Sequence, residues 1–224
     1  VPTRDWHDPR NTYILLFVLA VVVMWFGCNN ASREIVKEEA IYSRERSVNL
    51  RIAPYLASKF LVLSAITTLQ VGLLLVFVWL PLEMLSWWVP GHTVPPAALM
   101  ASYPAQFLVF SVLGMAGVAM GLLLSACVSS PDRANALLPY VLIPQMILGG
   151  GFIAVTGLVF WVAAVAAPVY WGFRATHLGA DVLPKGFPGH AGYGDGIGLP
   201  LLAMAAQAAA MLVLTYVFLR RKDV

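Results

Sequence analysis

The chain has 224 residues, of which 60% are hydrophobic and only 11% are charged. Soluble domains are about half apolar and about a quarter charged, so this balance excludes an ordinary water-exposed surface. The net charge of +3 does not indicate nucleic-acid binding, because the Lys and Arg residues fall between apolar stretches and form no basic patch. We therefore expect an all-α membrane protein with a single transmembrane domain over residues 1–224.

Several apolar stretches are close to the ~20 residues that a helix needs to cross a bilayer core. They predict about five transmembrane helices, at residues 13–29, 54–80, 103–127, 136–153 and 199–219. An odd number of spans with an outside N-terminus and no signal sequence predicts that a preceding transmembrane helix is missing from this chain.

The orientation of these spans follows from the positions of the basic residues. The segment 31–51 between the first two spans is the most charged part of the chain, and its basic residues are Arg33, Lys37, Arg44, Arg46 and Arg51. Basic residues next to spans favour the cytosolic side, and the last span also stops at a basic cluster, at residues 220–222. We expect both segments to be cytosolic.

Glycines recur along one face of the predicted span 103–127, at Gly114, Gly117 and Gly121. Small residues at steps of three and four allow two membrane helices to approach closely. The alternative is that glycine is simply common in membrane helices.

The fourth predicted span, residues 136–153, contains Pro139, Pro144 and a glycine triplet at 149–151. Such breaks are tolerated where protein or water satisfies the freed backbone groups, so we expect this helix to line a pathway. The apolar stretch 156–167 is too short to span alone and predicts a re-entrant segment on the outer side. An external loop is expected over residues 170–198.

The sequence contains no pattern for catalysis within the spans, because every His, Asp and Glu lies in a predicted loop or at a span boundary. The histidines and the two cysteines lack metal-ligand spacing, so we expect no metal site. There is also no phosphate-binding GxxxxGK[ST] motif. Any energy from ATP must therefore come from a partner or from a domain outside this chain.

The charged segment 31–51 is the strongest positive signal in the sequence. Its residues are good helix formers, and Glu34 and Lys37 lie one turn apart, where they can pair. A charged cytosolic helix joined to two spans could pass the movement of a soluble partner to the membrane. The alternative is a plain solvated loop.

The same segment carries a family resemblance. The run at residues 27–35, continued by Glu38, Glu39, residues 42–46 and residues 55–59, resembles the membrane domain of ABC type-2 transporters. It is most similar to the ABCG (White-type) exporters, and among them to bacterial half-transporters with fused ATPase and forkhead-associated domains. Residues 149–153 and 168–175 resemble two later motifs of that family, in the same order.

The resemblance implies a six-helix exporter domain, of which this chain holds helices two to six. Such a domain forms a homodimer in a bacterial plasma or inner membrane and moves a lipophilic substrate, such as a lipid, a glycolipid or a drug-like molecule. ATP and Mg²⁺ would bind to a partner nucleotide-binding domain, so the chain would be part of an ATP-hydrolysing translocase without a catalytic site of its own. Its coupling helix would contact that domain through Arg33, Glu34, Glu38, Glu39, Arg44, Glu45 and Arg46.

The resemblance also implies a substrate cavity lined by family helices two and five. The corresponding residues are Phe17, Trp25 and Phe26 in the first predicted span, and Tyr140, Gln145 and Met146 in the fourth. Phe152 and Ile153 match the apolar pair that forms the outer valve of the family. Aromatic residues at helical spacing can also be ordinary packing residues, and that alternative stays open.

The sequence departs from the family in three respects: the first helix is absent, no ATPase precedes it, and the outer loop lacks the cysteines of animal members. These departures indicate a fragment or a split chain from a bacterial source. Two other functions remain open, namely a membrane anchor that recruits a cytosolic protein without transport and an ion-coupled transporter. The absence of ionisable residues within the spans weakens the second.

Overall fold

The computed structural model describes residues 9–39, 42, 44, 51–88, 103–152, 155–180 and 196–222. Within these ranges the chain forms helices and turns and no strand, which confirms the predicted all-α class. The elements are α1 (Pro9–Ala31), η1 (Val36–Glu38), α3 (Ile52–Trp88), α4 (Tyr103–Cys127), α5 (Pro131–Leu148), α6 (Gly157–Ala166), α7 (Pro168–Ala180) and α8 (Gly198–Lys222).

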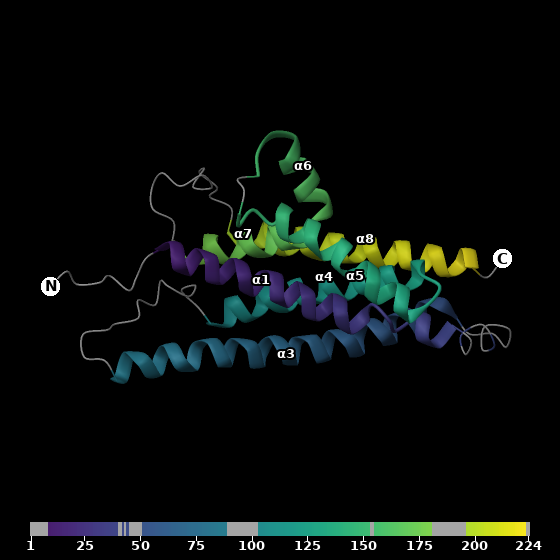
Figure 1. The fold of residues 1–224 in the computed structure, drawn as a ribbon, viewed down its shortest axis with the longest axis horizontal. Coiled ribbons are helices and arrows are strands. Elements are labelled where there is room, and N and C mark those ends of the chain that lie inside the picture. Colours follow the sequence, from purple (N-terminus) through teal and green to yellow (C-terminus); the bar gives the residue numbers. More distant parts are fainter. Residues whose placement is uncertain are drawn as a thin grey trace.

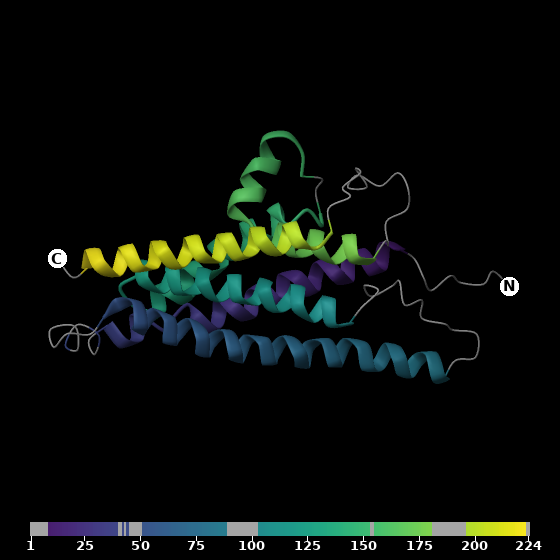
Figure 2. The ribbon, with the colours of Figure 1, turned by 180° about the vertical axis from the view of Figure 1, so that it is seen from behind.

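The long helices α1, α3, α4 and α8 lie side by side as an elongated bundle (Figure 1). Helix α4 packs against the other three. It is the most enclosed of the four, because 67% of its most apolar 18-residue stretch is buried. Helix α6 projects away from the bundle in both views (Figures 1 and 2). The C-terminal ends of α1, α4 and α8 and the N-terminal end of α3 lie at the same end of the bundle (Figure 1).

Among the described residues, four helices are long and apolar enough to cross a membrane: Tyr13–Glu38, Ile52–Pro81, Tyr103–Cys127 and Gly198–Arg221. Helices α6 and α7 pass the same test together, bent by 99° at their junction, and would make a fifth span if counted as one. The total agrees with the predicted number of about five. The chain is a multi-pass membrane protein.

The fourth predicted span needs a correction. The helix there, α5, covers Pro131–Leu148 instead of 136–153, and it is not among the four long apolar helices. It begins early because Ser130 is its N-cap, with the Ser130 Oγ accepting from the Arg133 backbone nitrogen at 3.3 Å, and because Pro131 suits the first turn. Pro139 and Pro144 lie inside the helix without ending it.

The outer region also differs from the prediction. The expected re-entrant segment 156–167 corresponds to α6, but the loop expected from residue 170 is wrong up to residue 180, where the chain forms α7. The reason is packing: Trp171 and Phe173 are buried, and a Cβ on Gly172 would lie 2.6 Å from the Leu113 side chain of α4. Glycine and histidine in this stretch therefore do not indicate a solvated loop.

The contact between α1 and α4 is the closest in the bundle and confirms the role predicted for the glycines. A Cβ on Gly27 would lie 2.2 Å from the Gly114 carbonyl oxygen, and a Cβ on Gly117 would lie 2.7 Å from the Met24 oxygen. A Cβ on Gly121 would lie 2.5 Å from the Cys28 oxygen. The two backbones touch, so only glycine fits at these positions.

Candidate functional site

The charged segment begins directly after α1, and we call its residues 32–39 the α1 extension. Ser32 continues the helical bonding, since its backbone nitrogen donates to the Cys28 oxygen at 2.9 Å. Its Oγ donates to the Asn29 oxygen at 3.2 Å. A tighter turn follows, in which the Glu38 nitrogen donates to the Ile35 oxygen at 3.1 Å. The extension therefore continues α1 with further helical turns and is not a plain loop.

A serine of α4 holds the extension in place. The Ser125 Oγ accepts from the backbone nitrogens of Ile35 and Val36, both at 3.0 Å, and all these groups are buried. A tight turn after a helix leaves such N–H groups without carbonyl partners, and an unpaired buried N–H is costly. Ser125 satisfies two of them with one side chain.

The apolar face of the extension packs under several helices at once. Ile35 belongs to a buried cluster with Leu56 of α3, Leu122 of α4 and Leu219 of α8. Val36 belongs to another cluster with Val128 and Ala134, at the start of α5. A displacement of the extension would therefore act on α3, α4, α5 and α8 as well as on α1.

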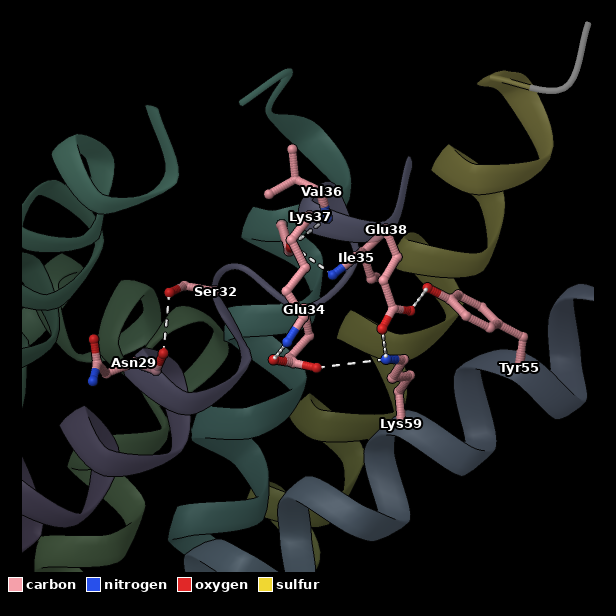
Figure 3. A network of polar contacts seen from close by, with 10 residues as sticks. Asn29, Ser32, Glu34, Ile35, Val36, Lys37, Glu38, Tyr55 and Lys59 are labelled. Atoms are coloured by element: carbon pink, nitrogen blue, oxygen red, sulfur yellow. Dashed lines mark hydrogen bonds and ion pairs between the residues drawn. The ribbon is translucent and has the colours of Figure 1, made fainter. Parts of the chain in front are cut away.

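The polar face of the extension binds a lysine from α3 (Figure 3). The Lys59 Nζ donates to the Glu38 carboxylate at 2.6 Å and lies 3.5 Å from the Glu34 carboxylate. Tyr55, one turn earlier on α3, donates its hydroxyl to Glu38 at 3.3 Å. Glu34 also pairs with Lys37 within the extension, as the sequence predicted. These contacts tie the extension to α3 through two carboxylates.

Three of the other predicted coupling residues lie at the surface. Arg33, Glu39 and Arg44 are exposed at the surface of the chain. Glu45 and Arg46 lie outside the described residues. The segment thus has one face bound to α3 through Glu34 and Glu38, and it also carries exposed charges of both signs.

Sequence reasoning missed three partners of the extension, which are Lys59, Tyr55 and Ser125. The ammonium group of Lys59 lies between the Glu34 and Glu38 carboxylates. Tyr55 and Lys59 are four residues apart and share one helix face, and that spacing could have indicated a joint site. Ser125 gives no sequence signal, because a single serine near a helix end is common in membrane helices.

The residues predicted to line a substrate cavity fall into two groups. Trp25 of α1 and Tyr140 of α5 are 44% and 75% exposed, while Phe26 and Met146 are partly buried. Phe17 differs from the prediction, because it is only 2% exposed and lies in the core. Gln145 is also buried and donates to the Ala166 carbonyl oxygen at 2.8 Å.

Phe17 instead organises the turn after α5. Its ring packs edge-on against Phe152, with a centroid distance of 5.0 Å, and against Phe173 at 5.1 Å. A Cβ on Gly151 would lie 2.2 Å from the Phe17 ring. Tyr13, one turn before Phe17, donates its hydroxyl to the Gly150 oxygen at 3.0 Å. The glycine triplet thus allows the turn that carries Phe152 to pack closely against α1. Ile153 lies outside the described residues.

A family model described as "ABC-2 type transporter" matches residues 6–178, which is most of the chain. The chain belongs to the ABC-2 type transporter family. It is also similar to the ABC transporter ATP-binding/permease protein Rv1747 of Mycobacterium tuberculosis, with 29% identity over 187 residues. That match covers 81% of this chain but only 20% of the relative.

Membership in the ABC-2 type transporter family confirms the resemblance drawn from residues 27–59. The matched range contains the α1 extension, the glycine contact between α1 and α4, and the turn with Phe152. Along the chain, these three features follow one another in the same order as the sequence motifs. The chain is a permease domain of the ABC transporter class.

Proposed function

We propose that this ABC-2 domain is the membrane part of an ATP-driven exporter and moves a lipophilic substrate out of the cytosol by alternating access. The α1 extension carries the proposal. One face of the extension is bound to Ser125, Lys59 and two apolar clusters, and Arg33 and Glu39 are exposed, as is Arg44 further along the chain. A partner that pushed on these exposed charges would move several helices together.

The partner we propose is a nucleotide-binding domain that holds ATP and Mg²⁺. The printed name of the mycobacterial relative combines an ATP-binding part with a permease part, and this chain spans about a fifth of that protein. The present sequence has no phosphate-binding loop of the GxxxxGK[ST] type. ATP binding and hydrolysis would therefore take place on another domain or subunit.

The proposed orientation puts the α1 extension in the cytosol of a bacterial cell. The C-terminal end of α8, with Arg220 and Arg221, lies at the same end of the bundle as the α1 extension (Figure 1). Basic residues gathered at one end of a helical bundle favour the cytosolic side of the membrane.

The proposed substrate pathway lies along α1 and α5, which pack against each other. Trp25 and Tyr140 expose aromatic rings on these helices, and a second copy of the chain, in an ABCG-like homodimer, would enclose them. Apolar, aromatic walls suit lipids and other hydrophobic molecules. Phe152, packed on Phe17, would act with Ile153 as the outer valve.

The proposal is tested with the transporter assembled with its ATPase in lipid nanodiscs. We expect Arg33→Ala and Arg44→Ala together to lower the coupled ATPase rate roughly tenfold, which corresponds to the loss of one well-formed interface contact. The matched control is Arg221→Ala, which removes an exposed cation from the same end of the bundle. This control should leave the rate unchanged.

The same preparation separates export from anchoring. Hydrolysis that responds neither to the combined Arg33→Ala and Arg44→Ala change nor to Arg221→Ala, with the ATPase still bound, would favour a scaffold that recruits a partner without transport. Equal losses in the control would show a general effect of positive charge. Only a loss confined to the α1 extension supports its role as the coupling element.

A further inference from the structure

The junction of α6 and α7 leaves a helix end inside the protein. Helix α6 ends at Ala166, and the chain turns by 99° into α7, which begins with Pro168. Proline has no N–H to donate, so the carbonyls of the last turn of α6 lose some of their usual partners. Within a membrane, water cannot replace those partners, and each unpaired carbonyl is costly.

Side chains from three other helices supply the missing donors. Gln207 of α8 donates its Nε2 to the Ala164 oxygen at 2.9 Å and to the Val165 oxygen at 3.0 Å. Gln145 of α5 donates to the Ala166 oxygen at 2.8 Å. Trp171 of α7 also donates to the Ala164 oxygen, at 2.8 Å. The Ala167 nitrogen pairs with the Ala163 oxygen at 2.9 Å, so the whole last turn is satisfied.

The bond from Gln145 has a consequence for the turn after α5. Its two ends are 21 residues apart and enclose the glycine triplet, Phe152 and α6. We call the segment between these two residues, which leaves the bundle after α5 and returns with α7, the α5–α6 excursion. The hydrogen bond from Gln145 joins the two ends of this segment, which are its base. Gln207 fixes the same base to α8. Both glutamines are more than nine-tenths buried, so solvent does not compete for their amides.

Helix α6 has few other contacts that could hold it. Ala163 is its only buried residue, while Leu158, Trp161 and Val165 are 81%, 67% and 73% exposed. The helix also stands away from the bundle (Figure 2). The position of α6, and of the turn before it, thus depends on the hydrogen bonds at its C-terminal end.

We propose that Gln145 and Gln207 are positioning residues that lock the base of the α5–α6 excursion and so keep Phe152 seated against Phe17. This inference rests on the proposed function for the meaning of Phe152 as a valve. It gives Gln145 a role different from the substrate contact predicted from the sequence. Loss of either amide frees α6 to move relative to α5 without altering the exposed rings of the pathway.

The test measures the distance between spin labels on α5 and α6, in the assembled transporter in nanodiscs without nucleotide. The labels replace two exposed residues, Ile143→Cys and Leu158→Cys. We expect Gln145→Met, which keeps the side-chain length but cannot donate, to increase the population at displaced distances about three- to tenfold. Gln207→Met should act in the same direction.

The matched control is Gln106→Met on α4. Gln106 is also buried and accepts a hydrogen bond from the Trp79 Nε1 at 3.0 Å, but it has no bond to α6. This change should lower the thermal unfolding temperature as the other two do, while leaving the label distances as they are. Equal distance distributions in all variants would overturn the proposal and leave the glutamines as general stabilising residues.

A milder variant covers the case in which Gln145→Met does not fold. Gln145→Asn keeps the amide but shortens the side chain by one methylene, so the bond to Ala166 lengthens or breaks. We expect an intermediate shift in the label distances, and no shift would also overturn the proposal. Because the readout needs no ATP, the lock can be established even if ATP-driven export is refuted.

Discussion

The Ser125 Oγ lies 3.0 Å from the backbone nitrogens of both Ile35 and Val36, so one hydroxyl of α4 anchors the turn that follows α1. Ser125 is 90 positions from Ile35 and 89 positions from Val36 in the chain. Their contact joins the most enclosed helix of the bundle to the segment proposed to receive the force of ATP binding. The anchor is therefore a stabilising contact and, under the proposed function, would also be part of the coupling path.

Ser125→Ala should destabilise the domain by about 1–3 kcal/mol, because it leaves buried N–H groups without an acceptor. The measurement is thermal unfolding in detergent micelles, followed by tryptophan fluorescence. Ser111→Ala is the matched control, since Ser111 is a buried serine of the same helix whose Oγ has no hydrogen-bond partner among the described residues. Equal unfolding temperatures for the two variants would contradict the anchoring role.

Gly27→Ala should prevent the normal packing of α1 on α4. The new Cβ would lie 2.2 Å from the Gly114 oxygen, and backbone on both sides leaves little room to relax. We expect a loss of about 3 kcal/mol or more, at the upper end of overpacking effects. The assay is the yield of monodisperse protein and its unfolding temperature.

Gly72→Ala on α3 is the control for this change. Its Cβ would meet only the Phe107 side chain, at an ordinary 3.5 Å. Because alanine favours helix more than glycine does, by about 1 kcal/mol, this variant should be as stable as the parent or more so. A comparable loss at both positions would mean that close approach is not the cause.

Gly151→Ala should destabilise the turn after α5, since its Cβ would overlap the Phe17 ring at 2.2 Å. Phe17→Leu in the same chain removes part of that ring and should restore some of the loss. The coupling energy from a double-mutant cycle is expected to be about 1–3 kcal/mol in the favourable direction. Gly198→Ala, where nothing lies within 4 Å of the added Cβ, should be neutral.

Lys59→Glu should weaken the attachment of the α1 extension to α3. It replaces an attraction to Glu34 and Glu38 with repulsion, worth about 1 kcal/mol per partly exposed pair. We expect a small drop in unfolding temperature but a clear loss of ATPase coupling in the assembled transporter. The swap Lys59→Glu with Glu38→Lys should recover part of the coupling, and failure to do so would argue against the ion pair as a link.

Some features of this protein could be read from the chain because they depend on local composition. Apolar runs of membrane length predicted the helices at α1, α3, α4 and α8, and glycine spacing predicted the close face of α4. The pairing of Glu34 with Lys37 followed from helical spacing. The motifs at residues 27–59 indicated the ABC type-2 family, and the family match confirms it.

Other features could not be predicted because they depend on partners distant in the sequence. Helix α7 forms where an external loop was expected, since burial of Trp171 and Phe173 outweighs local propensity. Phe17 was assigned to a cavity from its helix, whereas the rings of Phe152 and Phe173 enclose it. A helical position alone does not tell which neighbour covers a side chain.

By itself the sequence determined the class of protein, the four long apolar helices α1, α3, α4 and α8 and the position of the charged segment after the first of them, because hydrophobicity and charge act residue by residue against a membrane. The tertiary structure alone decided that Ser125 anchors the α1 extension, that Lys59 joins two of its carboxylates, and that Gln145 and Gln207 hold the end of α6. Each of these contacts pairs a polar group with a partner far away in the sequence, and only the packing of distant helices determines which donor and acceptor meet.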